Sequence, residues 1–340
     1  MELYNKLSNK ERALIIKKAN EERLTLSFYI YQKIEDAQNF RNYLFLNLDK
    51  LGVLGRIYLA NEGINAQLSI PSKKIDYLRK FLSQIPFLKN VHLNIGIEQK
   101  NNSFLKLKVK VRNKIVADGL QDNEYDIKDT GTHVSAKEFN DLMEKDETIT
   151  IDMRNHYESE IGHFKGAICP NVDSFRDSLK LVNKKFDYAK NKRNILMYCT
   201  GGIRCEKASA LLKHNGYKNV FQLSGGIIEY ARQVKESGIE NKFLGKNFVF
   251  DNRLSERIGT EVIAKCHLCG EVSDNHVNCN NEACHVLFIQ CESCHKKLNG
   301  CCSISCKDNF ELPIEVRKKA RKIRKSNSRF FKKGRVNEKV

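Results

Sequence analysis

Nine of the twelve cysteines of this chain lie in one short segment, between Cys266 and Cys306. Their spacing is paired: Cys266-x2-Cys269, Cys279-x4-Cys284, Cys291-x2-Cys294 and Cys301-Cys302-x3-Cys306. A tight C-x2-C turn presents two sulfurs to one tetrahedral ion, which is the geometry of a zinc knuckle. A segment of roughly 40 residues with few large apolar side chains cannot build a core alone, so metal must supply its folding free energy. We therefore predict a C-terminal Cys-rich zinc-binding module over residues 260–312.

The module is expected to hold two structural Zn²⁺ ions. The first pair can share an ion with the third and the second with the fourth, as in interleaved modules, or sharing can be sequential. Iron–sulfur clusters and a redox-active thiol cluster are the alternatives. Cys301 and Cys302 compete for one position, and the neighbouring His267, His276, His285 and His295 are substitutes for a sulfur. The predicted ligands are Cys266, Cys269, Cys279, Cys284, Cys291, Cys294, Cys302 and Cys306.

The composition is that of a globular intracellular protein, with 41% hydrophobic and 29% charged residues. No stretch approaches the roughly 18 to 20 uncharged apolar residues of a membrane span. The first residues, MELYNKLSNKERALIIKKANEER, are too charged for a secretory signal. We expect a cytoplasmic protein with no membrane partner. The cytosol keeps thiols reduced, which also favours metal over disulfides. The oligomeric state is left open.

The net charge of +18 favours a polyanionic partner, RNA or DNA. Part of the charge is local, because the residues from Glu315 to the end include 12 basic and 2 acidic side chains. In this basic tail, residues 313–340, the segment 316–325 has helix-forming residues, and Phe330-Phe331 offers aromatic surface for stacking on bases. The alternative is a solvated tail that adds only non-specific affinity.

Residues 1–21 are expected to form a helical lead-in to an N-terminal domain over residues 22–118. Pro71 is expected to open the second helix of that domain at its first turn. The order β-α-β-β-α-β predicts a ferredoxin-like α+β domain. The expected strands are 24–30, 53–59, 64–70, 91–97 and 105–111, and the expected helices are 34–51 and 71–82.

A second domain, over residues 132–245, follows the polar stretch from Gly119 to Gly131. Strands are expected at 148–152, 194–198 and 219–223, and a helix at 204–215. Strands that alternate with helices indicate an α/β domain with a parallel, doubly wound sheet.

The segment Tyr198-Cys-Thr-Gly-Gly-Ile-Arg-Cys-Glu-Lys207 joins the end of a predicted strand to a helix through a glycine-rich loop. In a doubly wound sheet, ligands bind at the carboxyl ends of the strands. Loop amides and the positive end of the helix would cradle an anion around the Cys199 sulfur. Such a cradle lowers the pKa of a thiol and favours the nucleophilic thiolate. We predict Cys199 as the catalytic residue and an anion-binding loop made of Thr200, Gly201, Gly202, Ile203 and Arg204. The alternative is a buried, inert cysteine.

Cys205 lies in the first turn of the helix that follows this loop. It is either a redox partner that forms a disulfide with Cys199 or a small packed residue at a helix start. The sequence supports both readings equally.

Several motifs together resemble the rhodanese domain in order and spacing. The resemblance implies that Cys199 is a persulfide carrier or nucleophile. It also implies that Asp152 and Arg154 support the site at the end of the first strand. We expect these two to form a structural salt bridge that holds the loop, the alternative being a direct part in the chemistry, and we expect His163 to be structural. The motifs are Asp152-Met-Arg154, Glu158, Gly162-His-Phe-Lys-Gly-Ala167, Cys199-x-x-Gly-x-Arg204, Gly216-Tyr-x-x-Val220 and Leu223-x-Gly-Gly226.

The resemblance extends into the N-terminal domain, through Val53-Leu-Gly-Arg-Ile-Tyr-Leu-Ala-Asn-Glu-Gly-Ile-Asn-Ala-Gln67 and Leu105-Lys-Leu-Lys-Val-Lys110. With the full cysteine loop, these segments are similar to the rhodanese-related tRNA uridine hydroxylase family, over roughly residues 22 to 310. Membership implies oxygen-dependent hydroxylation of wobble uridine to 5-hydroxyuridine in tRNA. It implies molecular oxygen as cosubstrate, tRNA as partner and Cys199 as the required residue.

The residues alone lead to a reactive thiol, an anion cradle and a basic chain, and not to hydroxylation. No flavin or nicotinamide motif is present. Cys199 can add to C6 of uracil and make C5 nucleophilic toward an oxidant, or it can carry a reactive sulfur species. One alternative function is a sulfurtransferase that carries a persulfide on Cys199. Another, of a different class, is a non-catalytic zinc-containing RNA-binding protein.

Overall fold

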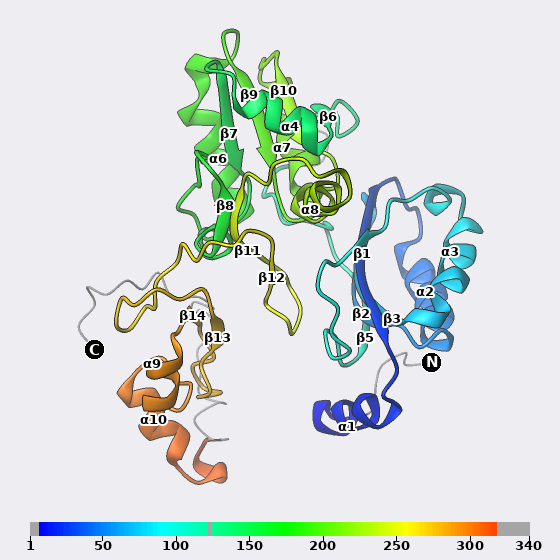
Figure 1. Cartoon of the computed structure of the whole chain (residues 1–340). Coiled ribbons are helices and arrows are strands. Elements are labelled where there is room, and N and C mark those ends of the chain that lie inside the picture. The colour runs from blue at the N-terminus through cyan, green and yellow to red at the C-terminus, as the bar shows by residue number, and fades with distance from the viewer. Residues whose placement is uncertain (1–6, 122–123, 318–340) are drawn as a thin grey trace. The chain divides into compact units, whose positions relative to one another are not determined.

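A computed structural model describes residues 7–121 and 124–317 (Figure 1). The described chain forms two compact units. The first contains the residues up to Asn155, Gly166–Asn241 and Val249–Glu256, and the second contains His156–Lys165, Lys242–Phe248 and the residues from Arg257 onward. The predictions for the basic tail beyond Arg317, including Phe330-Phe331, lie outside the described residues.

The first unit begins with helix α1 (Asn9–Ala19) and a five-stranded sheet in the order β4-β1-β3-β2-β5. Strands β1 and β2 both pair antiparallel with β3, which lies between them, and β5 pairs parallel with β2. The predicted β-α-β-β-α-β order and the ferredoxin-like class are confirmed. The elements are β1 (Arg23–Tyr31), α2 (Ala37–Lys50), β2 (Leu54–Ala60), β3 (Gly63–Pro71), η1 (Ser72–Lys74), α3 (Ile75–Ser83), η2 (Pro86–Leu88), β4 (Asn94–Ile95) and β5 (Leu107–Val111).

The two faces of this sheet differ in chemistry. Helices α2 and α3 lie together on one side of it (Figure 1), where the core includes Phe28, Ile57 and Leu68. Side chains alternate across a strand. The side chains of the residues between these core positions therefore lie on the opposite face. In β1, β2 and β3 they are polar or aromatic, and Tyr29 and Arg56 are examples.

The prediction that Pro71 opens a helix was wrong. Pro71 is the last residue of β3, where it pairs with Arg23, and its backbone is extended at φ −49° and ψ 126°. The next residue continues the strand pairing, because the Ser72 N–H donates to the Glu22 carbonyl at 2.9 Å. A 3-10 turn at Ser72–Lys74 then leads into α3 at Ile75.

The second sheet of this unit is parallel throughout, in the order β6-β10-β9-β7. On one face, α6 and α7 pack on Ile151 and Met197 in a common core. On the other face, the Tyr198 ring of β9 meets Phe139 of α4, which in turn meets Tyr230 of α8. Helices on both faces confirm the doubly wound class. The elements are β6 (Thr132–Val134), α4 (Ala136–Met143), β7 (Thr148–Asp152), α6 (Phe175–Lys185), η3 (Asp187–Ala189), β9 (Asn194–Tyr198), α7 (Ile203–His214), β10 (Val220–Leu223) and α8 (Gly226–Ser237).

The second unit contains a short antiparallel pair and the cysteine-rich module. Strand β8 pairs with β11, and β13 pairs with β14. The apolar core of the module is small: one cluster buries Val286 and Phe288 beside three cysteines, and the other buried apolar side chains from Cys266 to Cys306 are Leu287, Ile289 and Leu298. The small number of buried apolar side chains agrees with the expectation that metal stabilises the module. The elements of this unit are α5 (His156–Ser159), β8 (Gly162–Phe164), β11 (Phe243–Phe248), β13 (His276–Asn278), β14 (Leu287–Ile289), α9 (Glu292–Lys297) and α10 (Ile304–Glu311), while the boundary between the units falls within β12 (Ser255–Arg257).

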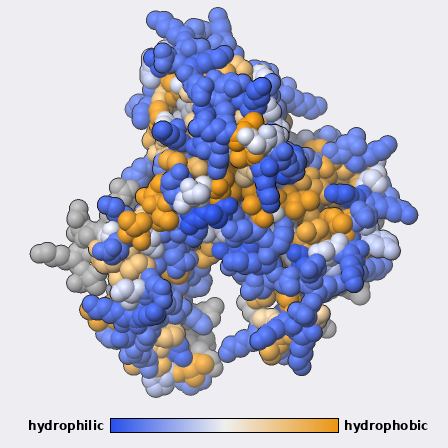
Figure 2. All heavy atoms as spheres, in the orientation of Figure 1, coloured by the Kyte–Doolittle hydropathy of each residue, from blue (hydrophilic) through white to orange (hydrophobic). Residues whose placement is uncertain are grey.

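Hydrophilic residues predominate on the face drawn in Figure 2, with hydrophobic residues at the surface in separate areas. Among the residues that the structure describes, no helix combines the length and apolar character that crossing a membrane requires.

Candidate functional site

The cysteine loop lies between the end of β9 and the start of α7. Gly202 precedes the helix with φ 99°, a conformation that favours glycine, and its N–H donates to the Cys199 sulfur at 3.2 Å. The start of α8 contacts the loop, because the Ile227 N–H donates a hydrogen bond to the Cys199 carbonyl oxygen at 3.0 Å. A Cβ on Gly226 would lie 2.5 Å from that carbonyl oxygen, so this close approach requires glycine.

The surroundings of Cys199 favour its thiolate. Burial alone would raise the pKa of this thiol, but other interactions outweigh it and lower the pKa to about 6. They are a hydrogen bond from the Cys205 thiol, the charge of Arg204 and the backbone N–H groups of Arg204 and Cys205. The Arg204 guanidinium donates to the Thr200 hydroxyl at 3.3 Å and lies 5.9 Å from the Phe250 ring centroid. Of the loop residues predicted to cradle an anion, Gly202 and Arg204 thus interact with the sulfur through their backbone N–H groups.

Cys205 is fully buried beside Cys199, and both are free thiols. Burial raises the pKa of Cys205 well above its usual value, and the hydrogen bond to Cys199 raises it further. The pair is therefore a thiol next to a thiolate. Packing at the helix start and thiol exchange with Cys199 both agree with this geometry, so the role of Cys205 stays a prediction.

We expect selective alkylation of Cys199 to report its pKa. Because the thiolate is the reactive form, the rate with iodoacetamide should be constant above about pH 7 and fall about tenfold per pH unit below pH 6. Arg204→Gln should move this transition to higher pH, since it removes a positive charge that stabilises the thiolate. The measurement is peptide mass spectrometry at timed quenches, with Cys205 as the internal control. Equal labelling of the two cysteines at pH 7 would contradict the assignment.

A pocket of about 350 Å³ opens beside this loop, within the first unit. Its size falls in the range of about 300–1,000 Å³ that is usual for small-molecule sites. Cys199 lines it but has no exposed surface, so a substrate must fit closely to reach the sulfur. The other wall is the polar face of the N-terminal sheet. The lining residues are Ser27, Phe28, Tyr29, Arg56, Tyr58, Asn65, Gln67, Ile115, Val116, Cys199, Thr200, Gly201, Ile203, Arg204 and Phe250.

Sequence reasoning missed this second wall. The signal was present in the alternation of the strands: Tyr29, Asn65 and Tyr58 are cross-strand neighbours, and so are Ser27, Gln67 and Arg56. Phe250 carried no local signal, because it lies about 50 residues beyond the loop and far from any motif.

Two tyrosines of β1 attach the N-terminal sheet to the cysteine loop. The Tyr29 hydroxyl donates to the Glu206 carboxylate at 2.9 Å, and the Tyr31 hydroxyl donates to the Ile203 carbonyl at 3.1 Å. A Cβ on Gly202 would lie 2.6 Å from the Tyr29 hydroxyl oxygen, so glycine at this position also makes room for the tyrosine. The loop is therefore positioned by both domains of the unit.

Glu206 and Lys207, the next two side chains of α7, are charged and largely buried. Burial would raise the pKa of Glu206, but hydrogen bonds from His133, Gln222 and Tyr29 and the His133 charge lower it overall. The Lys207 ammonium lies 2.7 Å from a Glu62 carboxylate oxygen and 2.5 Å from one of Asp118. Because Lys207 is 2% exposed, removing either of its acidic partners would leave a buried charge under-compensated.

Asp152 and Arg154 form the ion pair that the sequence predicted at the end of β7. The shortest N–O distance is 2.6 Å, and both side chains are fully buried. The Arg154 guanidinium also lies 5.7 Å from the ring centroid of Tyr198, the residue that directly precedes Cys199. The Asp152–Arg154 pair thus supports the end of the strand at which the cysteine loop begins.

His163, which was expected to be structural, belongs to the second unit, where its Nδ1 lies 2.9 Å from the Ser159 carbonyl oxygen.

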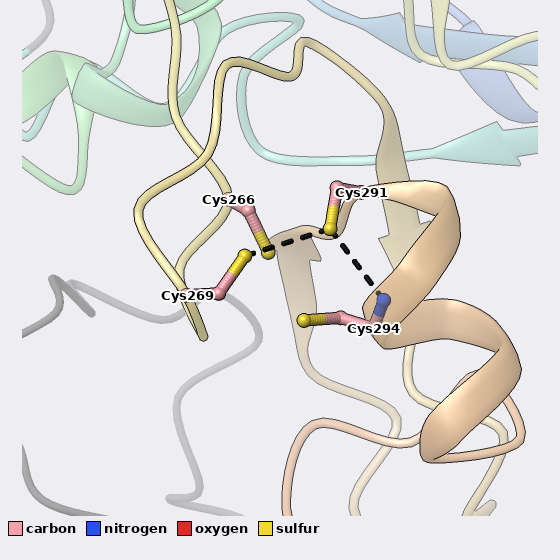
Figure 3. A group of neighbouring side chains, drawn as sticks. All are labelled: Cys266, Cys269, Cys291 and Cys294. Carbon is pink, nitrogen blue, oxygen red and sulfur yellow. Dashed lines mark hydrogen bonds between the residues drawn. The ribbon is translucent and has the colours of Figure 1, made fainter.

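The eight cysteines predicted as ligands form two groups of four, within each of which the sulfurs lie no more than 4.8 Å apart. Figure 3 shows the first group, in which Cys291 and Cys294 belong to the start of α9 and the other two to the loop before β13. Of the two sharing schemes, the structure has the interleaved one. Cys301 belongs to neither group. The groups are Cys266, Cys269, Cys291 and Cys294, and Cys279, Cys284, Cys302 and Cys306.

The sulfur spacings fit a tetrahedral ion. Sulfur–sulfur distances of 3.6 and 3.7 Å occur in the two groups. Four ligands at a zinc–sulfur distance of about 2.3 Å would be about 3.8 Å apart. No histidine of the described residues joins either group. His267 instead places its Nε2 2.8 Å from the Glu160 carboxylate, within the same unit.

The fold and the loop define a rhodanese-like protein with an added N-terminal domain and a cysteine-rich end. Family models match in the same order: the UPF0176 acylphosphatase like domain over residues 23–115, the rhodanese-like domain over 135–233 and the rhodanase C-terminal region over 244–307. The tRNA uridine(34) hydroxylase of Leptospira interrogans is 53% identical over 96% of this chain and 88% of its own. That of Yersinia enterocolitica is 48% identical over 97% and 95%. The chain belongs to the tRNA uridine(34) hydroxylase family.

Proposed function

We propose that this protein hydroxylates the wobble uridine of tRNA to 5-hydroxyuridine, with molecular oxygen as cosubstrate and Cys199 at the reaction centre. The observation that carries the proposal is a low-pKa thiol at the wall of a pocket of about 350 Å³, which the ring of Phe250 also lines. Aromatic rings of this kind stack on a base that has left its helix or loop. The full-length similarity to hydroxylases supports the reaction type, and we place the enzyme in the cytoplasm with its tRNA.

The chemistry at Cys199 begins with addition of the thiolate to C6 of the uracil ring. The new C–S bond moves the C5–C6 π electrons to C5, which then attacks O2, so that a C5–O bond forms and C5 carries a hydroperoxide. The C5 proton is lost as the C6–S bond breaks, which restores the double bond and returns the thiolate. The anion-binding loop from Thr200 to Arg204 stabilises the charge that develops on the ring oxygens.

Electron balance assigns a role to Cys205. One oxygen atom enters the C5–OH group and the other leaves as water, which requires two electrons and two protons besides O2. After its release from C6, the Cys199 thiolate attacks the outer oxygen of the C5 hydroperoxide and breaks the O–O bond. The Cys205 thiol then displaces that oxygen as water and forms a disulfide with Cys199. The pair thus supplies the two electrons and one proton, solvent supplies the second proton, and an external dithiol reduces the disulfide again. The hydrogen bond between the two thiols supports this pairing.

The two cysteine groups are proposed to hold one structural Zn²⁺ each. The fit of the sulfur spacings to a tetrahedral ion and the small apolar core of the module support this assignment. Neither group belongs to the unit that contains Cys199, so no step of the reaction is assigned to the metal.

The test is deletion of the gene in its host, followed by nucleoside mass spectrometry of total tRNA. Loss of 5-hydroxyuridine and its derivatives, restored by the intact gene, is the expected result. Growth of the complemented strain under isotopically heavy oxygen gas should place the heavy atom in the hydroxyl group. Unchanged 5-hydroxyuridine with a parallel fall in thiolated nucleosides would instead support sulfur transfer through a Cys199 persulfide.

A further inference from the structure

Four basic residues lie on one face of the N-terminal sheet, the face opposite α2 and α3. We call Arg56, Lys108, Lys110 and Arg112 the basic face. Arg56 pairs across the strands with Lys108. Leu107 and Val109 of β5 are buried in the core, so the lysines between and after them point to the other side.

Tyr58 belongs to the same face. It pairs with Lys110, and the Arg112 guanidinium lies 5.6 Å from its ring centroid. An arginine held against an exposed aromatic ring keeps its N–H groups available at the ring edge. Arg112 and Tyr58 therefore present a cation and a stacking surface side by side.

Within the part of the chain that the structure describes, no ion pair neutralises the charges of the basic face. All four residues are exposed, and none of the ion pairs within residues 7–121 and 124–317 includes any of them. Partial burial lowers the pKa of Lys108, and the nearby charges of Lys106, Arg56 and Lys110 lower it further. The cations thus repel one another, and an anionic partner would relieve that repulsion.

The basic face continues from the Cys199 pocket into a second hollow. Arg56 and Tyr58 line the pocket. Tyr58 and Arg112 also line a hollow of about 610 Å³, together with Lys114 and Arg176. The Arg176 side chain lies over Gly119, where a Cβ would come within 2.6 Å of its Cγ. Tyr58 and Ile115 thus line both hollows, and cations lie on both sides of Tyr58.

We propose that the basic face and the adjoining hollow bind the sugar-phosphate backbone of the unpaired nucleotides next to the base that occupies the Cys199 pocket. A positively charged path with an aromatic platform is how proteins hold single-stranded nucleic acid. Here Tyr58 stacks on the neighbouring base, while Lys108, Lys110 and Arg112 contact phosphates. The inference rests on the proposed function in one respect, that the pocket receives a base of an RNA loop.

The test compares two triple variants of the full-length protein with equal loss of charge. Lys108→Gln/Lys110→Gln/Arg112→Gln changes the basic face. Lys137→Gln/Lys180→Gln/Lys184→Gln changes exposed lysines on α4 and α6 of the same unit. The probe is a fluorescent anticodon stem–loop RNA with uridine at the wobble position, titrated by anisotropy over a range of salt concentrations. Thermal unfolding curves check that both variants fold.

The basic-face variant should bind about tenfold to a hundredfold more weakly at physiological salt. Its slope of log Kd against log salt should be smaller by about 2, since each single-strand phosphate contact contributes about 0.7. The control should differ from wild type by less than about threefold. Equal losses in both variants, or a fully paired RNA that competes as well as the stem–loop, would overturn the proposal. Binding that depends on this face in a protein that forms no 5-hydroxyuridine would overturn the proposed function and leave the surface intact.

Discussion

Cys199→Ala is expected to abolish 5-hydroxyuridine formation in tRNA, with a fall in rate of about a thousandfold or more. Removal of an enzyme nucleophile typically costs about 10³- to 10⁶-fold, because no other group supplies the same bond. Here the lost group is a thiolate whose pKa the loop lowers to about 6. The measurement is 5-hydroxyuridine in total tRNA from a deletion strain that carries the variant gene, with the wild-type gene in parallel.

The matched control is Cys169→Ala. Cys169 likewise forms no disulfide and, unlike Cys199, is only partly buried, and it does not line the Cys199 pocket. This variant should restore 5-hydroxyuridine to at least about half the wild-type level. If Cys199→Ala restores the nucleoside equally well, Cys199 is a structural residue and the mechanism at C6 of uracil is wrong. Soluble yield and the unfolding temperature of both variants show whether a loss reflects chemistry or folding.

Removal of metal is expected to unfold the cysteine-rich module. Structural zinc contributes an apparent free energy of about 10–16 kcal/mol in small domains of this type, and the apolar core here is too small to replace it. Elemental analysis should find two zinc ions per chain, one for each group of four sulfurs. A strong chelator should release both and expose the segment from Cys266 to Cys306 to proteolysis.

Point variants separate ligands from other cysteines. Cys291→Ser should lose one zinc ion per chain, because it removes a sulfur from a group of four. Cys301→Ala should keep both ions, since Cys301 is buried but stands outside both groups. Iron with visible absorbance in place of zinc would favour an iron–sulfur cluster. A purified chain that carries no stoichiometric metal and resists proteolysis would contradict the structural role.

The features that the sequence predicted are those encoded by neighbouring residues. The Cys199 loop, the flanking strand and the helix after it follow from consecutive residue types. The pairing of Asp152 with Arg154 was expected from the resemblance to the rhodanese domain, and the structure has it. The cysteine spacing likewise gave the eight sulfurs, but not their sharing. Which pairs share an ion depends on how β13, β14 and α9 fold, because this places the third cysteine pair beside the first and the fourth beside the second. The spacing of the cysteines does not encode that arrangement.

The features that were missed depend on contacts between distant segments. The wall formed by Tyr29 and Tyr58 faces the loop only after the N-terminal sheet and the parallel sheet have packed. The buried link from Lys207 to Glu62 joins residues 145 positions apart. Pro71 shows the opposite error: a local rule for helix starts gave way to strand pairing with Arg23, a tertiary interaction.

The attachment of the loop to the N-terminal sheet has a consequence for how such an enzyme acquires its selectivity. The loop alone offers a thiolate and an anion cradle, which any small acceptor can use. The Tyr29 hydroxyl donates a hydrogen bond to Glu206, and the Tyr31 hydroxyl donates one to the loop backbone. The N-terminal sheet therefore stays opposite the sulfur, and only molecules that fit between the sheet and the loop reach it. Choice of substrate and reactivity are thus divided between the N-terminal domain and the rhodanese-like domain. New specificities can therefore arise by altering the wall while the sulfur chemistry stays untouched.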